Sequence, residues 1–109
     1  MAVALSITII RYVDDGFPGW VECELLDAFG RRHRFMEKVP VVTRESLLQE
    51  SSYPCGGTIA CELVSAWADE EGYSLTQVDT SSPWGIESMD GVIKFTVPSA
   101  LLSPNVILS

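Results

Sequence analysis

The residues best suited to hold an anion form one short basic run in an otherwise acidic chain, and they are Arg31, Arg32, His33 and Arg34. An arginine guanidinium is a planar fork of donors that matches a carboxylate or a phosphate. On a hairpin tip, this run can therefore bind such an anion. The alternative is that alternate arginines face solvent and pair with Glu22 or Glu24 on the adjacent strand. The pattern favours the ion pairs and keeps the anion site as a second possibility.

A second group of candidate binding residues lies in the loop region that follows Thr80. Trp84 sits in the sequence Ser-Ser-Pro-Trp-Gly, and Glu87 and Asp90 follow it. The cores of protein interfaces favour large aromatic side chains, so Trp84 can anchor a partner. The alternatives are that Trp84 folds over the end of the domain, and that the acidic residues serve the turns in which they lie.

No residue is predicted to be catalytic. Cys55 precedes two glycines whose amides can stabilise an oxyanion, yet nothing in the sequence supplies a lowered thiol pKa or a neighbouring base. The motifs of phosphate-binding loops, dinucleotide-binding folds and nucleophile elbows are absent. The sequence therefore argues against an enzyme without excluding one.

No metal and no cofactor are predicted either. A zinc site needs about four ligands, usually with paired short spacings such as C-x-x-C. The three cysteines stand at positions 23, 55 and 61, so no such pair exists, and His33 is the only histidine.

Charge is unevenly distributed along the chain, whose formal net charge is −8 from 7 basic and 15 acidic residues. Residues 1–44 are balanced, whereas residues 45–93 contain nine acidic residues and no lysine or arginine. A net negative charge excludes general binding to a nucleic-acid backbone. It predicts an acidic face, which either serves solubility or docks a basic protein partner.

The candidate residues must be positioned mainly by β-strands. Apolar residues alternate at Val3, Leu5, Ile7 and Ile9, which predicts a half-buried strand over 3–13. Similar signals predict strands over 20–26, 32–39, 58–68, 73–78 and 92–97, with a short segment at 86–89 before the Asp90-Gly91 hairpin signal. The sequence therefore predicts an all-β, mainly antiparallel domain, a small barrel or sandwich of six to seven strands. At most one short helix is expected, near residues 43–50, with Thr43 as its N-cap.

The length predicts one domain over residues 1–109. The segment Cys23–Phe29 resembles Cys61–Trp67 at an offset of 38 residues, which predicts two similar hairpins over 20–39 and 58–79 and raises the possibility of a duplication. Buried free cysteines would then occupy equivalent inward positions.

The apolar C-terminal tail, 98–109, is expected to pack along a sheet edge or to contact a second subunit.

Three functional hypotheses follow. The odd number of cysteines and the lack of a signal peptide or a membrane-spanning segment predict a cytoplasmic protein without a membrane partner. We expect first a β-barrel interaction module whose acidic face binds a protein partner, as an inhibitor or immunity protein binds a basic enzyme. The alternatives are a small-molecule or anion-binding barrel with the Arg31–Arg34 cluster near its mouth, and a structural homodimer formed by the tail or an edge strand. Nucleic acid is not an expected partner.

Overall fold

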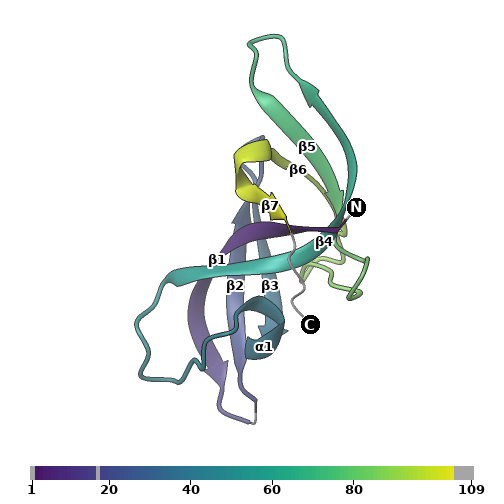
Figure 1. Ribbon diagram of the computed structural model, residues 1–109. Helices are drawn as coiled ribbons and strands as arrows, with labels where there is room; N and C mark the ends of the chain where they lie inside the picture. Colours follow the sequence, from purple (N-terminus) through teal and green to yellow (C-terminus); the bar gives the residue numbers. More distant parts are fainter. Residues whose placement is uncertain (1, 17, 105–109) are drawn as a thin grey trace.

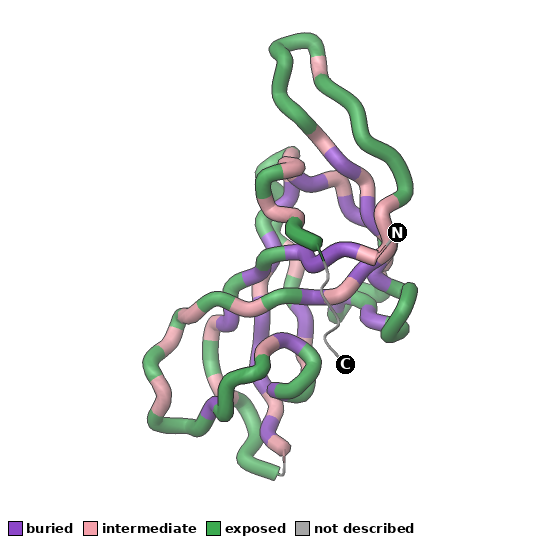
Figure 2. The backbone as a smooth tube through the Cα atoms, in the orientation of Figure 1, coloured by how far each residue is buried: buried purple, intermediate pink, exposed green. Residues whose placement is uncertain are grey.

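The first strand shows how the apolar alternation builds the core. The computed structural model describes residues 2–16 and 18–104. In β1 (Ala2–Asp14), the predicted inward residues Val3, Leu5, Ile7 and Ile9 are at most 7% exposed, while the residues at positions 6 and 8 face solvent. Figure 2 shows buried backbone positions along the centre of the molecule, where this strand lies.

All strands of the described residues belong to one antiparallel sheet, curled into an open half-barrel (Figure 1). The strand order is β3-β2-β1-β4-β5-β6, and β7 pairs with β1. The remaining elements are β2 (Trp20–Leu26), β3 (Arg32–Lys38), α1 (Val39–Val42), β4 (Cys55–Ala68), β5 (Ser74–Asp79), β6 (Lys94–Pro98), the 3₁₀ turn η1 (Ser99–Leu101) and β7 (Leu102–Pro104). The all-β, antiparallel prediction is confirmed. Because a single sheet carries every strand, the molecule is barrel-like and is not a two-sheet sandwich.

The two outer strands, β3 and β6, approach each other across the open side of the half-barrel. Their side chains meet there: the Phe35 and Phe95 rings lie 5.6 Å apart between centroids, and the His33 and Phe95 rings 4.8 Å apart. Two backbone hydrogen bonds bridge the gap, from Ala28 N–H to the Thr96 carbonyl (2.9 Å) and from Met89 N–H to the Arg34 carbonyl (2.8 Å). We call this line of approach the seam.

The predicted helix near residues 43–50 is wrong, because the helix lies one segment earlier, at α1 (Val39–Val42). Pro40 stands in the first turn, where the missing N–H is one that has no intrahelical partner in any case. Thr43 ends this helix, and its N–H donates to the Val39 carbonyl (3.1 Å). Its hydroxyl accepts from the Glu45 N–H (3.1 Å), so it stabilises a turn and not a helix N-terminus.

Strand β4 begins at Cys55, three residues before the predicted start. Gly56 and Gly57, which precede the predicted start, are part of the strand. A Cβ atom on Gly57 would come within 2.8 Å of the Ile9 side chain and 2.9 Å of the Val42 carbonyl. A glycine is therefore needed here for the close approach of neighbouring groups, which is a recognised use of glycine inside strands.

The hairpins β2–β3 and β4–β5 share the same turn, which begins at Asp27 and at Asp69. The Oδ1 atom of Asp27 accepts the N–H groups of Phe29 and Arg31, and that of Asp69 accepts those of Glu71 and Tyr73, all at 2.9 Å. Each turn also has a glycine at positive φ, which is +80° at Gly30 and +87° at Gly72. The two hairpins therefore have equivalent turns and pair with opposite sides of β1.

The last third of the chain departs from simple hairpins. Asp90-Gly91 does form a tight turn, in which Gly91 N–H donates to the Ser88 carbonyl (2.9 Å), but residues 86–89 are not a strand. Residues 80–93 instead form a long loop between β5 and β6. The tail pairs with β1 through Leu102–Pro104, and positions 105–109 lie outside the described residues.

In the part of the chain that is described, no helix is long and apolar enough to cross a membrane.

Candidate functional site

The inner face of β3 carries the side chains around which both candidate sites are built. His33, Phe35 and Glu37 alternate along this strand and share one face of it. Phe35 is fully buried and separates the other two. His33 and Glu37 are four residues apart, roughly 13 Å along a strand, so they lie at different positions on the seam. Each of them lines its own pocket.

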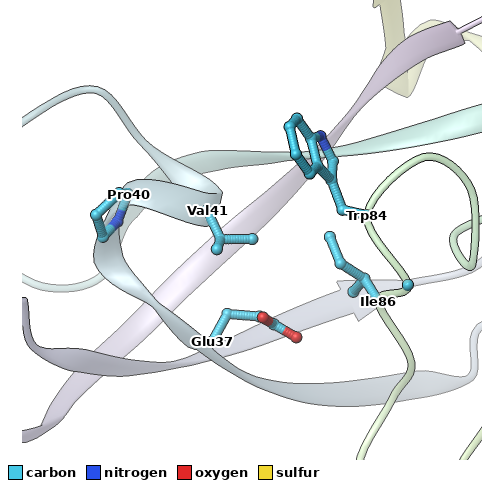
Figure 3. Close-up of a pocket in the computed structure, with 6 residues that line it drawn as sticks. Glu37, Pro40, Val41, Trp84 and Ile86 are labelled. Carbon is cyan, nitrogen blue, oxygen red and sulfur yellow. The ribbon is translucent and has the colours of Figure 1, made fainter.

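The first of these, the Trp84 pocket, has a volume of about 310 Å³ and lies between α1 and the loop 80–93. It is lined by Glu37, Pro40, Val41, Trp84, Gly85 and Ile86. In Figure 3, the Glu37 carboxylate, the Val41 and Ile86 side chains and the Trp84 indole surround a common space. The pocket therefore combines apolar walls, one aromatic ring and one acidic group.

An ordered loop holds Trp84 at the pocket although its side chain is 64% exposed. The buried Thr80 hydroxyl donates to the Ile86 carbonyl (2.7 Å), and Ile86 N–H donates back to the Thr80 carbonyl (3.0 Å). Gly85 N–H donates to the Ser81 carbonyl (2.8 Å), with φ of +67° at Gly85. Ile86 is 3% exposed and anchors the loop in the core. The hydrogen-bonded backbone of the loop therefore holds Trp84 in its exposed position.

Glu37 is the polar group of this pocket. It pairs with Val21 of β2, which is fully buried, and its carboxylate makes no hydrogen bond or ion pair with any described residue. Burial raises the pKa of the Glu37 carboxyl above its ordinary value. A partly buried acid without a partner is uncommon, since buried polar groups are normally hydrogen-bonded.

The second pocket, the His33 pocket, lies further along the seam and has a volume of about 450 Å³. It brings together four of the predicted site residues, which are Arg31, Arg32, His33 and Asp90. Lys94 from β6 and Asp27 from the β2–β3 turn also line it. Cationic and acidic side chains are therefore mixed around this space.

A histidine–aspartate pair forms the inner wall of the His33 pocket. His33 Nε2 lies 2.8 Å from Asp27 Oδ2, and the two side chains are only 10% and 7% exposed. Burial by itself raises the pKa of Asp27, but the hydrogen bond with His33 and those from the backbone N–H groups of Arg31 and Phe29 outweigh it. The pKa of Asp27 is therefore lowered, and the carboxylate stays ionised beside the imidazole.

The outer face of the sheet holds the ion pairs predicted for the basic run. Arg34 Nη1 donates to Glu22 Oε2, and Glu22 Oε1 accepts from Arg11 Nε (2.8 Å). Arg32 Nη1 lies 3.4 Å from Glu24. The hydrogen bond from Arg34 is the main reason that the pKa of Glu22 is lowered. Two of the three arginines of the run therefore pair with strand β2.

The acidic residues of positions 45–93 are spread over several places. Asp69, Glu70 and Glu71 form the β4–β5 turn, and Glu45 and Glu50 lie between α1 and β4. Glu87 and Asp90 lie in the loop 80–93, which also carries Trp84, and both are exposed. Glu87 does not line the Trp84 pocket, whose acidic group is Glu37.

The cysteines show no sign of reactivity. Burial raises the pKa of Cys23 to about 12 and that of Cys61 to about 11, and it also raises the pKa of Cys55. Near neutral pH all three are thiols, which are poor nucleophiles. Over residues 2–16 and 18–104, no three His, Cys, Asp or Glu side chains are grouped so as to hold a metal ion.

Sequence reasoning missed the central residue of the Trp84 pocket. Glu37 lies within the predicted strand 32–39 but is not among the predicted site residues. The available signal was that Glu37 lies two residues after Phe35, on the same face of the strand, where a core-facing strand normally has an apolar residue. The apolar walls, Val41 and Ile86, come from α1, which was not predicted, and from the loop 80–93, in which residues 86–89 were expected to form a separate short segment.

Comparisons with known proteins add no functional information. No family model matches this chain, and neither the curated proteins nor the solved structures contain a significant match.

Proposed function

We propose that this protein is a binding module that captures a basic side chain of a protein partner in the Trp84 pocket. The observation that carries the proposal is the Glu37 carboxylate, which is partly buried beside an exposed indole and has no hydrogen-bond or ion-pair partner among the described residues. Trp84 is the aromatic anchor and Glu37 is the counter-ion. The function is recognition, and no catalytic step is assigned to the site.

A lysine or arginine side chain matches every part of this pocket. Its methylene stem can pack on Val41 and Ile86, because long basic side chains bury their stems along apolar surface. Its charge can lie against the Trp84 ring, which attracts cations through its electron-rich face. Glu37 then receives a charge-assisted hydrogen bond, and such bonds are stronger than those between neutral groups.

The charge of the whole molecule favours a basic partner. The net charge of −8 attracts cationic proteins over a distance and repels nucleic acid. Glu87 and Asp90 place part of that charge on the loop that carries Trp84. An inhibitor or immunity protein that covers a basic enzyme is one form of such a module. The three free cysteines support a reducing, cytoplasmic setting for it.

Anion binding in the His33 pocket is the second candidate, and one observation favours it. Arg31 and Lys94 line the same space as His33, which lies in a protected wall. Asp27 and Asp90 also line this pocket and oppose an anion, so we rank this function second. Phosphate and citrate, added to the wild-type protein and to Arg31→Ala, test it by thermal shift. A rise in Tm that Arg31→Ala abolishes supports the site, and no shift removes it.

The test of the main proposal uses N-acetyl-lysine methylamide as the probe, followed by two-dimensional NMR. We expect chemical-shift changes at the Trp84 indole N–H and the Gly85 amide, saturating with added probe. Glu37→Gln and Trp84→Ala should weaken binding at least several-fold. Glu87→Gln is the matched control, because it removes the same charge from an exposed residue of the loop outside the pocket.

Two outcomes would contradict the proposal. The first is that the probe perturbs no residue of the Trp84 pocket. The second is that Glu37→Gln and Glu87→Gln weaken binding equally, because the effect would then come from net charge and not from the pocket.

A further inference from the structure

Strand β4 continues well beyond the strand that flanks it. Its pairing with β1 ends at Ala2 opposite Glu62, whereas β4 itself runs to Ala68. From Leu63 onward, β5 pairs with one side of β4, and within the described residues no strand pairs with the other side. Figure 1 shows this hairpin projecting from the body of the molecule. The unpaired side leaves backbone N–H and carbonyl groups open to another strand.

The unpaired segment, Val64–Ala68, lacks most of the features that protect natural sheet edges. Its sequence is Val-Ser-Ala-Trp-Ala, without a charge or a proline, and all five residues are exposed. Val64 is 47% exposed and Trp67 41% exposed. The pairing of β4 with β5 shifts register between Leu63 and Ser65, at the start of this segment. Edges of natural proteins usually carry lysine, proline or bulges that prevent pairing, so a neutral edge of this kind is suited to a partner strand.

We infer that this edge pairs with the same edge of a second copy of the chain, antiparallel, with a two-fold axis at Ala66. Val64 of each copy then faces Ala68 of the other, and Ser65 faces Trp67. Both indoles lie on the same face and are diagonal neighbours, which places them within contact distance. No charged side chain enters the ladder, and both exposed tryptophans lose contact with water.

The acidic turn of the hairpin decides between the two possible orientations. Asp69, Glu70 and Glu71 follow directly after the edge segment. Parallel pairing would place the two acidic turns side by side, where their charges repel. Antiparallel pairing separates the Glu70 positions by eight residues, roughly 27 Å at the rise of a strand. This distance exceeds the Debye length of about 10 Å at 0.1 M salt, so the repulsion between the two Glu70 residues is screened. In this register each Glu70 lies opposite Glu62 of the other copy, and this is the remaining acidic contact.

The oligomeric state tests this inference, measured by sedimentation equilibrium over a range of protein concentrations. We expect a concentration-dependent dimer for the wild-type protein and a monomer for Ala66→Lys, because two lysines would face each other at the axis. Thr58→Lys is the matched control. Thr58 is exposed on the same strand, but Ser6 of β1 already pairs with it, so the dimer should persist.

Ala66→Lys and Thr58→Lys change the net charge of the protein equally. A loss of the dimer in Ala66→Lys alone is therefore not an effect of net charge. A wild-type protein that stays monomeric at every concentration overturns the inference and leaves the edge to a strand of another protein. Equal behaviour of Ala66→Lys and Thr58→Lys also overturns it.

Disulfide cross-linking tests the register, in a background where Cys55 is changed to Ser. Residues directly opposite in an antiparallel pair have Cα atoms about 4.5–5.5 Å apart, within the range of about 4.4–6.8 Å that a disulfide needs. Ala66→Cys should therefore form a covalent dimer rapidly on oxidation. Val64→Cys should not, because Val64 faces Ala68. Equal cross-linking of the two variants contradicts the register.

Discussion

The Glu37 carboxylate weakens the isolated protein and strengthens the complex that we propose. In the free protein the ionised group lies among apolar neighbours, no described residue pairs with it, and its pKa is raised by burial. A bound cation supplies the missing charge and returns the pKa towards its ordinary value. Binding of a basic side chain should therefore strengthen as pH rises through the pKa of Glu37.

We also expect Glu37→Gln to stabilise the free protein at neutral pH. Because the folded-state pKa exceeds the ordinary value of 4.5, the wild-type protein loses stability as pH rises from 4.5 through the raised pKa. Glutamine has no charge and removes this loss. We expect a Tm a few degrees higher at pH 7 and no difference near pH 3, measured by thermal unfolding followed by circular dichroism. A variant that is less stable at pH 7 would show that the carboxylate has a stabilising partner.

The ionised Asp27 carboxylate stabilises the folded protein, in contrast to that of Glu37. Its pKa is lowered, so the ionised carboxylate contributes stability that is fully present above its ordinary pKa of 3.8 and is lost as pH falls through the lowered value. Asp27→Asn keeps an oxygen for the two turn N–H groups but weakens the bond with His33. We expect a loss of about 1–3 kcal/mol in urea unfolding at pH 7.

Asp69→Asn is the control for this prediction, because Asp69 makes the same turn and no histidine bond is formed there. Its effect should be clearly smaller than that of Asp27→Asn. Equal losses in the two variants would assign the effect to the turn and not to the bond with His33.

The loop 80–93 is the element on which the Trp84 pocket depends. Gly85 adopts a φ of +67°, which residues with a Cβ atom rarely adopt, yet a Cβ atom there would meet no atom within 4 Å. Gly85→Ala should therefore act through the backbone alone, with a loss of roughly 1 kcal/mol in stability and displacement of Trp84. We expect weaker binding of the lysine probe.

Gly56→Ala serves as its control. Gly56 also has open space around its Cβ position, but its φ is not positive. This variant should keep both its stability and its binding of the probe, measured by urea unfolding and NMR. Unchanged binding in Gly85→Ala would mean that the loop backbone does not position Trp84.

At the level of elements, the sequence predicts what depends on local pattern and misses what depends on tertiary contacts. The alternation from Val3 to Ile9 and the turns at Asp27 and Asp69 have local causes, and they are predicted. The start of β4 is missed because Gly57 serves a close approach to Ile9 and Val42. The Asp90-Gly91 signal is correct as a turn, and β6 follows it from Lys94, but residues 86–89 before it are not a strand, since Met89 N–H bonds across the seam to the Arg34 carbonyl of β3.

The candidate site was predictable only in part, for the same reason. Arg31, Arg32 and His33 are contiguous, so the basic run is visible in the sequence, and its ion pairs with β2 follow from strand alternation. The Trp84 pocket joins residues 37, 40–41 and 84–86, which are far apart in the chain. Only the curl of the sheet, which brings the loop 80–93 to β3, places Glu37 beneath Trp84.

On the scale of the whole molecule, charge and contact should affect binding differently. Long-range attraction by exposed acidic residues is screened by salt, whereas a direct ion pair in a pocket is screened much less. We therefore expect the double variant Glu87→Gln/Asp90→Asn to weaken binding of a short lysine-rich peptide at low salt only. Glu37→Gln should weaken it at every salt concentration, measured by isothermal titration calorimetry. The same salt dependence for both variants would contradict a distinct role for the pocket.

The most direct test of the central claim is a cycle of four affinities, for the wild-type protein and Glu37→Gln with N-acetyl-lysine methylamide and its uncharged norleucine analogue. The two probes share a hydrocarbon stem, so their difference isolates the ammonium group. We expect the wild-type protein to prefer lysine at least several-fold and Glu37→Gln to lose this preference. An equal preference for lysine in both proteins would show that Glu37 is not the partner of the cation, and would contradict the proposed function.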